Sequence, residues 1–248
     1  NITDIDDKIL LKVAEELPKT EHLEKDPARH PFNQISEKYY KSFLDDMRCI
    51  RVEPPDLTIK VSRHIPSIIR YINLLEKRGH AYITPKGDIY FHTLSLKNYV
   101  GRTRTDVDLR VNPDEFKRDP RDFVLWKAAK LGEPVWDYYS VVSNQHIPGR
   151  PGWHVQCSSI SSAMFGNNLD FHFGGIDLLF PHHYNEEACC CAYHGLDTST
   201  NLHVWSKNWL HSGHLVLKDQ KMSKSLGNVI TIKDFINDSS INALRLMG

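Results

Sequence analysis

The chain has 248 residues, of which 40% are hydrophobic and 25% are charged, as in an ordinary globular protein. Lysine plus arginine number 31 and aspartate plus glutamate also number 31, so the formal net charge is zero with histidine neutral. This balance excludes an intrinsically disordered chain and a uniformly basic nucleic-acid-binding surface, but not a local basic patch. No apolar run reaches the roughly 18 residues typical of a membrane span, so we expect no membrane partner.

Cysteine and histidine are distributed unevenly along the chain. There are five cysteines, and three of them are consecutive, at Cys189–Cys191. An odd number with no CxxC pair argues against a disulfide framework and a zinc ribbon, and it favours a reducing compartment. Fourteen histidines are present, and seven fall between His146 and His203, where we expect the chemistry to lie.

Periodicity predicts the elements of the first half of the chain. Apolar spacing indicates a helix between Asp4 and Pro18 and another at 36–48. The clearest helix covers 65–75, where isoleucine and leucine recur at i, i+3, i+4 and i+7. A hairpin is predicted at 81–91, and the polar, basic segment 99–122 is interpreted as a loop or extended arm.

In the second half, strands alternate with helices, which predicts an α/β core. The predicted elements are an apolar block from Phe123, a turn at 149–154, a helix at 157–165, a strand at 169–173, a helix at 182–194, a short strand at 215–217 and a last helix at 232–247. Thr231 and Asp234 form a capping-box pattern before this last helix.

One group of residues has the chemistry of a metal site. His182 and Glu186 are four residues apart on a predicted helix, so their side chains share a face, and Cys157 precedes the intervening strand. Thiolate, imidazole and carboxylate together form a credible zinc set with one position open. His183 is an alternative to His182. The competing interpretation is a surface His–Glu pair and a core cysteine.

Two loops carry possible nucleotide contacts. Gly174-Gly175-Ile176-Asp177 follows a predicted strand, where glycine permits close approach of a nucleotide and a carboxylate suits ribose hydroxyls. Taken alone, this pattern is a weak signal and is better explained by a plain turn. The string Lys221-Met222-Ser223-Lys224-Ser225 places two lysines beside hydroxyls, a combination that holds phosphate. It is not a P-loop, because G-x-x-x-x-G-K-[ST] is absent.

These strings together resemble the cysteinyl-tRNA synthetase family of class I aminoacyl-tRNA synthetases. Lys-Met-Ser-Lys-Ser is the class I signature. The companions, in the right order, are Asn1–Ile9 (NITDIDDKI), Gly149–His154 (GRPGWH) with Cys157, Gly174–Asp177 (GGID) with Phe180–His183 (FPHH), and His211–His214 (HSGH). The resemblance covers nearly the whole chain.

The resemblance implies an α/β fold, with a Rossmann-like catalytic core, an α+β connective insertion and a helical segment bearing the KMSKS loop. It places the end of the first Rossmann half at 1–19, the insertion at 20–120, the second half with the zinc site at 121–215, and the KMSKS loop with the start of a stem-contact helical region at 216–248. The implied reaction joins L-cysteine and ATP, with Mg²⁺, into cysteinyl-adenylate and transfers the cysteinyl group to tRNA(Cys).

The resemblance also assigns roles to residues. Zn²⁺ falls to Cys157, His182 and Glu186, and selects cysteine over serine by binding sulfur. Lys224, supported by Lys221, stabilises the leaving pyrophosphate. The other implied contacts are Gly174, Gly175, Asp177 and Lys224 for ATP, and Thr3, Trp153 and His172 for the cysteine substrate.

The sequence departs from the family pattern at three positions. Gln156 and Tyr184 stand where the family usually has glutamate, and Phe173 replaces a small residue and could narrow the nucleotide pocket. The family's HIGH motif and a fourth, cysteine, zinc ligand would precede Asn1, and an anticodon-reading domain would follow Gly248, so we expect the chain to be a fragment.

Other interpretations remain open at this stage. A cysteine ligase of the mycothiol type shares adenylation and zinc but usually lacks an intact KMSKS string, and a catalytically silent paralogue would have a binding role. The basic arm either approaches the tRNA acceptor stem or is a solvated loop; its cations are Arg102, Arg104, Arg110, Lys117, Arg118 and Arg121. The short stretch between Ile9 and Pro54 favours the mitochondrial matrix, with the cytoplasm as the alternative.

Overall fold

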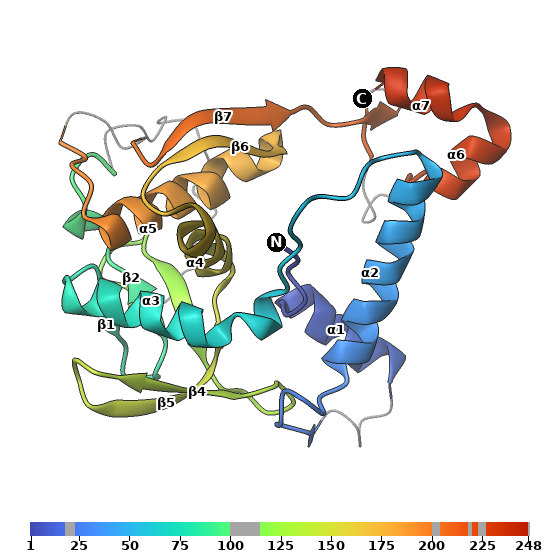
Figure 1. Ribbon diagram of the computed structural model, residues 1–248. Helices are drawn as coiled ribbons and strands as arrows, with labels where there is room; N and C mark the ends of the chain where they lie inside the picture. The colour runs from blue at the N-terminus through green and yellow to red at the C-terminus, as the bar shows by residue number, and fades with distance from the viewer. Residues whose placement is uncertain (18–22, 100–114, 200–203, 218–219, 223–226, 248) are drawn as a thin grey trace.

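The structure is a computed structural model that describes residues 1–17, 23–99, 115–199, 204–217, 220–222 and 227–247 (Figure 1). Its helices are α1 (Asp7–Glu16), α2 (Phe32–Cys49), α3 (Ile65–Lys77), α4 (Trp153–Phe165), α5 (Tyr184–His194), α6 (Ile232–Asp238) and α7 (Ile241–Met247). Short helical turns are η2 (Val61–Arg63), η3 (Thr93–Ser95), η5 (Ile176–Leu178) and the π-type turn η6 (Leu179–His183). The strands are β1 (Ala81–Ile83), β2 (Ile89–Phe91), β3 (Phe123–Ala128), β4 (Trp136–Ser140), β5 (Gln145–Pro151), β6 (Leu169–Gly175), β7 (Ser206–Ser212), β8 (Val216–Leu217) and β9 (Gln220–Lys221).

The strands form three sheets in the described part of the chain. Five antiparallel strands are ordered β1-β2-β3-β5-β4. β6 and β7 pair in parallel, with Phe171 opposite Asn208, and β8 and β9 form a short antiparallel pair. The hairpin predicted at 81–91 is confirmed as β1 and β2, with Gly87 at φ +89° in the turn, a conformation that favours glycine.

Local sequence signals account for three helix boundaries. Pro66 occupies the first turn of α3, where its missing N–H costs nothing, and Gly79 follows the helix end with φ +78°. The capping box before α6 is confirmed: Thr231 Oγ1 accepts from Asp234 N at 3.1 Å, and Thr231 N donates to the Asp234 carboxylate at 3.3 Å. The ends of α3 and the start of α6 therefore lie where local residues suit the backbone conformation or form the hydrogen bonds of a helix terminus.

The core joins the five-stranded sheet to the central helices. Ile68 and Leu75 of α3, Trp126 of β3 and Cys190 of α5 are fully buried in one hydrophobic cluster. Figure 1 shows α4 and α5 between this sheet and the β6–β7 pair. The packing brings the N-terminal part of α4 against the start of α5, and this contact creates the site described below.

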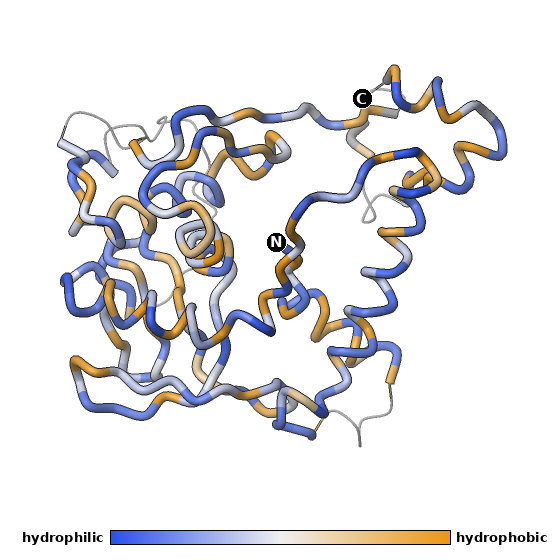
Figure 2. Tube along the Cα trace, in the orientation of Figure 1, coloured by the Kyte–Doolittle hydropathy of each residue, from blue (hydrophilic) through white to orange (hydrophobic). Residues whose placement is uncertain are grey.

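The N-terminal segment and α2 lie beside this body. Asp4 anchors the segment by accepting from Ser62 N at 2.9 Å and from the Ser62 hydroxyl. Arg150 of β5, which is buried, donates to Asp7 at 2.6 Å and to Glu133 at 2.8 Å, so α1 is tied to the sheet. Along α2 apolar and hydrophilic residues are interspersed (Figure 2), and Tyr39 and Phe43 are half exposed.

Several predicted boundaries are wrong. Residues 149–151 belong to β5 and not to a turn, because Gly149–Pro151 pairs with β3. The predicted last helix is divided at Ser239, whose extended backbone ends α6. The second helix begins at Phe32 and not at 36, and Gly174 and Gly175 form the end of β6 and do not follow it.

The five-stranded sheet includes strands from both sides of residue 120, where the sequence analysis places a domain boundary. The boundary itself stays a prediction. Within the described residues, no helix combines the length and the apolar character that crossing a membrane requires.

A buried carboxylate fastens α3 to β4. Glu76 accepts a hydrogen bond from the Tyr138 hydroxyl and another, at 3.1 Å, from the Ser140 hydroxyl. Burial raises the pKa of the Glu76 carboxyl above its ordinary 4.5, and the two hydrogen bonds act in the opposite direction. The side chain therefore holds its proton more tightly in the folded state than in the unfolded state.

We expect Glu76→Gln to flatten the pH dependence of stability. The contribution of the raised pKa to the free energy of unfolding is complete below the ordinary pKa of 4.5, and it is lost as the pH rises through the folded pKa. Each unit of upward shift corresponds to about 1.4 kcal/mol. Urea denaturation from about pH 4 to about pH 8 measures the free energy of unfolding of both proteins at each pH. Glu53→Gln, at an exposed position, is the control, and parallel profiles for the Glu76 variant and the unmodified protein would contradict the expectation.

Candidate metal centre

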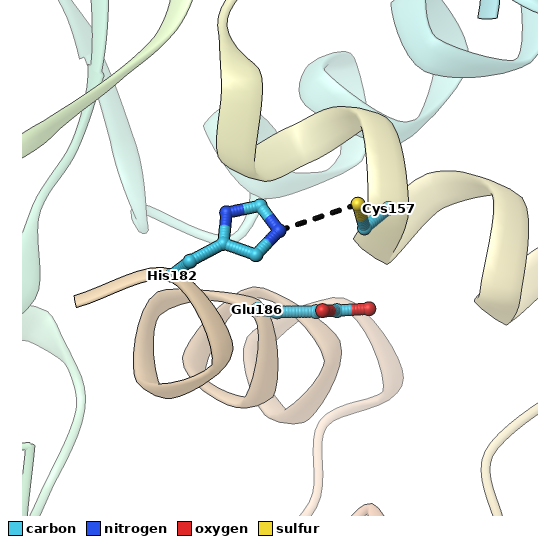
Figure 3. Close-up of side chains that lie close together, drawn as sticks. All are labelled: Cys157, His182 and Glu186. Carbon is cyan, nitrogen blue, oxygen red and sulfur yellow. Dashed lines mark hydrogen bonds between the residues drawn. The ribbon is translucent and has the colours of Figure 1, made fainter. Parts of the chain in front are cut away.

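Three potential metal ligands converge from two neighbouring helical segments (Figure 3). Cys157 lies on α4, His182 lies in η6 and Glu186 lies in the first turn of α5. Cys157 Sγ is 3.4 Å from His182 Nε2, and the sulfur, one ring nitrogen and one carboxylate oxygen all lie within 4.8 Å of one another. The sequence-predicted ligand set is therefore brought together, although His182 precedes α5 and does not belong to it.

The Glu186 carboxylate needs a partner. Its side chain is fully buried, and neither oxygen has a hydrogen-bond partner among the described residues; His172 Nε2 lies 3.5 Å from Oε2. Burial, followed by the charge of Glu187, raises the pKa of the Glu186 carboxyl to about 8. A bound cation would supply the missing interaction and would favour the ionised carboxylate.

The other two ligands are also in a dry environment. Burial, and then the Glu186 carboxylate, raise the pKa of the Cys157 thiol to about 12. Burial, and then the imidazoles of His154 and His183, lower the pKa of His182 to about 2, so this ring is neutral and retains a lone pair for a metal.

The donor set fits zinc. Zn²⁺ binds cysteine sulfur at about 2.3 Å and histidine nitrogen at about 2.0–2.1 Å, and a sulfur and a nitrogen 3.4 Å apart suit two corners of a tetrahedron. Zinc sites that bind water or a substrate typically have three protein ligands and leave the fourth position open. Asn1 reaches the same place, since its side-chain amide donates to Cys157 Sγ at 3.2 Å.

Glu186 also belongs to a second group of potential ligands, with His172 and His183. The His183 ring lies 2.7 Å, Nδ1 to Nε2, from the His211 ring and is not directed at Cys157 in any described contact. Of the two adjacent histidines that the sequence left open, the structure therefore places His182, and not His183, beside the thiol.

The predicted cysteine-pocket residues lie in different places. Trp153 stacks on the His182 ring with centroids 4.1 Å apart and lines a cavity of about 370 Å³ with His154 and Phe180. His172 lies beside Glu186 and stacks on Trp209 at 4.4 Å. Thr3 lines a different cavity, of about 530 Å³, between α1 and α2.

The predicted nucleotide loop adjoins the metal centre. Gly174 and Gly175 end β6, and Asp177 follows in η5. A Cβ at Gly174 would lie 2.3 Å from His183 Cε1, and one at Gly175 would lie 2.5 Å from Asp177 Oδ1. The His183 ring therefore leaves no room for a side chain at Gly174, whereas the Asp177 carboxylate would have to move to accommodate one at Gly175.

Lys221 pairs through its backbone with Val216 in the β8–β9 hairpin, while Lys224 lies outside the described residues. Most of the basic arm also lies outside the described residues, including Arg102, Arg104 and Arg110. Of its described cations, Arg118 packs over the Tyr82 ring at 4.1 Å and Arg121 pairs with Asp119 at 2.6 Å.

The three departures from the family pattern have distinct surroundings. Gln156 is buried and donates to Ile5 O at 3.3 Å. The Tyr184 hydroxyl donates to Tyr99 O at 2.9 Å. Phe173 is 71% exposed on the outer face of β6, beside Phe171, so it points away from the buried metal ligands.

Sequence reasoning assigned no role to three residues that support the centre. His154 lies behind His182, Asn185 lies behind His154, and the Tyr99 hydroxyl donates to Asn185 at 2.6 Å. Tyr99 comes from a segment far away in the sequence, and no local signal connects it to the site. His154 belongs to the GRPGWH string, but the string does not indicate its contact with Asn185.

Comparison with known proteins shows the family of the chain. The family described as "tRNA synthetases class I (C) catalytic domain" matches residues 1–247. The chain belongs to this family of class I tRNA synthetase catalytic domains.

Relatives of this class I (C) family have closely similar sequences. Cysteine–tRNA ligases from Methanococcus maripaludis (strain S2), Alkalilimnicola ehrlichii and Pyrococcus abyssi are 42%, 39% and 39% identical, each over 99% of this chain. The matches cover 47%, 49% and 47% of those proteins, so the chain spans about half the length of the curated relatives it matches.

A solved structure described as an arginyl-tRNA synthetase from Campylobacter jejuni has a similar fold. The TM-score is 0.50 at 11% sequence identity, over 96% of this chain and 48% of that one. At this identity the likeness concerns the fold alone, which is the mixed helix and strand architecture of a class I synthetase catalytic domain.

We expect Cys157→Ser to lower the zinc affinity of the synthetase domain by more than the roughly 10–100-fold that changes outside the ligand shell cost. Serine offers a poor, hard oxygen where the site presents sulfur. Competition with a chromogenic chelator measures the affinity. Cys49→Ser, at an exposed cysteine, is the matched control, and equal zinc binding by both variants would show that Cys157 is no ligand.

We expect Gly174→Ala to lower the free energy of unfolding by about 1–3 kcal/mol, the usual cost of overpacking. The new methyl would meet the His183 ring, which the His211 ring holds on its other side. Urea denaturation measures the change. Gly213→Ala is the control, because no heavy atom lies within 4 Å of the position that its methyl would take, and a Gly174 variant as stable as this control would contradict the close packing.

Proposed function

We propose that the protein activates L-cysteine with ATP and Mg²⁺ to cysteinyl-adenylate and transfers the cysteinyl group to tRNA(Cys). The observation that supports this most directly is the group formed by the half-buried thiol of Cys157, the buried imidazole of His182 and the buried carboxylate of Glu186, which has no hydrogen-bond partner among the described residues. Membership of the class I (C) family and relatives named cysteine–tRNA ligase support the same reaction. A site of this composition is suited to a substrate that itself contributes sulfur.

Substrate selection would depend on the metal centre. Cys157, His182 and Glu186 would hold a zinc ion, which would bind the substrate through sulfur and discriminate against the hydroxyl of serine. Trp153, stacked on His182 and 40% exposed, forms a wall beside this position. Burial of the ligands keeps water away from the position where the amino acid binds.

The remaining chemistry needs positioning and charge neutralisation more than a nucleophilic side chain. The substrate carboxylate attacks the α-phosphate of ATP, and pyrophosphate leaves. Lys224 and Lys221 would stabilise the leaving pyrophosphate, while Gly174, Gly175 and Asp177 would contact the adenosine. His172 is 3.5 Å from Glu186 and lies on β6, the strand that ends in Gly174 and Gly175; Thr3, on the other cavity, would act only indirectly.

The finer organisation belongs to the same proposal. The parallel β6–β7 pair, with α4 and α5 against it, supports a Rossmann-like half that carries the metal centre. The segment before it would be a connective insertion, and the α6–α7 region would carry the KMSKS loop. A mitochondrial location is a further proposal, based on the short stretch between Ile9 and Pro54.

Two other functions are separated from this one by their products. A mycothiol-type ligase would join cysteine to an amino sugar, and a silent paralogue would form no adenylate. The relatives named cysteine–tRNA ligase favour tRNA charging over amino-sugar ligation.

The decisive experiment is ATP–pyrophosphate exchange with the intact protein, followed by charging of tRNA(Cys). We expect exchange that depends on cysteine and not on serine. Lys224→Ala is expected to lower the exchange rate about 10²–10³-fold, as the removal of one transition-state contact does. Lys233→Ala, in α6 outside the loop, is the control.

Exchange without tRNA charging, together with amino-sugar ligation, would indicate the mycothiol-type reaction. Zinc-loaded protein that shows no cysteine-dependent exchange would indicate the silent paralogue. Either result would overturn the proposed function.

A further inference from the structure

The metal-ligating ring of His182 has a second nitrogen with a specific partner. Nε2 faces Cys157, and Nδ1 lies 3.1 Å from Nδ1 of His154. Two ring nitrogens at this distance form a hydrogen bond only when one carries a proton and the other does not, so one Nδ1 donates and the other accepts.

The contact continues to the far side of His154. Nε2 of this ring lies 3.3 Å from the amide nitrogen of Asn185, and the amide oxygen accepts from the Tyr99 hydroxyl at 2.6 Å. All three side chains are at least nine-tenths buried. Tyr99 is itself held, because its carbonyl accepts from Tyr184. Phe123 packs edge-on against the His154 ring, with centroids 5.1 Å apart.

Two proton arrangements are compatible with the positions of these atoms. When Asn185 donates its N–H to His154 Nε2 and its oxygen accepts from the Tyr99 hydroxyl, His154 carries its proton on Nδ1 and donates to His182, whose own proton then lies on Nε2 and blocks that ligand atom. When the Asn185 amide is turned over, its oxygen accepts from His154 Nε2–H and its nitrogen donates to the Tyr99 hydroxyl oxygen. His154 Nδ1 then accepts from His182 Nδ1–H, and the His182 Nε2 lone pair is open to a metal.

We propose that His154 and Asn185, supported by Tyr99, are positioning residues that set the tautomer of His182 and thereby the zinc affinity of the site. This inference rests on the proposed zinc centre and deepens it. None of the three residues is among the candidate ligands. They act by determining which nitrogen of His182 carries the proton, with no change in net charge. Partners behind a metal-bound histidine commonly contribute 10–100-fold in affinity.

The first test substitutes His154 in the intact protein and measures zinc affinity by competition with a chromogenic chelator. His154→Phe keeps a ring but removes the acceptor, so we expect affinity to fall 10–100-fold. His154→Asn places an amide oxygen near the former Nδ1 position, and we expect it to bind zinc more tightly than the Phe variant although it fills less space. His80→Phe removes a histidine hydrogen-bonded to Ser95 away from the centre and is the control.

The second test changes the side chain at position 185, which faces His154 Nε2. Asn185→Asp presents an oxygen both to His154 Nε2–H and to the Tyr99 hydroxyl, so it selects the tautomer of His182 that binds metal. Asn185→Leu presents neither a donor nor an acceptor. We expect the Asp variant to bind zinc at least as tightly as the unmodified protein and the Leu variant to bind 10–100-fold less tightly. The absorption spectrum of Co²⁺-loaded protein reports whether sulfur and nitrogen remain ligands.

A purely structural role predicts a different pattern. In that case both substitutions at each position would weaken zinc binding in proportion to their loss of thermal stability, which circular dichroism measures on the same samples. That pattern would overturn the inference, as would a His154→Phe variant that binds zinc normally. If Cys157→Ser loses zinc while His154→Phe retains it, only the positioning role fails. Absence of zinc binding in the unmodified protein would instead remove the proposed centre itself.

Discussion

The structure of the site depends on a buried carboxylate that accepts no hydrogen bond from any described residue. Glu186 and Glu187 are consecutive and both fully buried, yet they have different surroundings. Glu187 accepts from the backbone amides of Val204 and Trp205 at 2.7 and 2.6 Å and from that of Ser206 at 3.2 Å, which fixes α5 to the start of β7. Glu186 receives no such donors among the described residues. Since burying an uncompensated carboxylate is costly, Glu186 either keeps its proton, as its raised pKa indicates, or is compensated by a bound cation.

Helix α5 therefore carries Glu187, which fixes the helix to the start of β7, next to Glu186, which is a candidate metal ligand. The backbone amides hold α5 in place without using Glu186, so the position of the candidate ligand does not depend on the ion it would bind. A site organised in this way is preformed, and binding a metal there costs little rearrangement of the chain. The negative charge of Glu187 also repels an ionised Glu186, which raises the pKa of the Glu186 carboxyl further.

The sequence predicted which candidate ligands lie together better than it predicted their surroundings. The i, i+4 spacing of His182 and Glu186 and the position of Cys157 indicated three residues that the structure places close together, because side chains four residues apart in a helical segment are neighbours. The capping box at Thr231 and the hairpin at 81–91 were equally local. The turn predicted at 149–154 was wrong because pairing of β5 with β3 overrides glycine and proline, a contact between distant segments. Tyr99, which lies 86 residues from Asn185, was invisible for the same reason.

Motifs that are separate in the sequence form one contact network in the fold. The His183 ring contacts His211 Nε2 through Nδ1, and its Cε1 and Nε2 atoms leave no room for a side chain at Gly174. His172 on β6 lies against both His183 and Glu186. A change in the glycine loop would therefore be transmitted to the metal ligands through packed imidazoles, without any flexible element between them. This geometry holds the candidate metal centre and the glycine loop at a fixed distance from each other, as the proposed in-line attack on a phosphate would require.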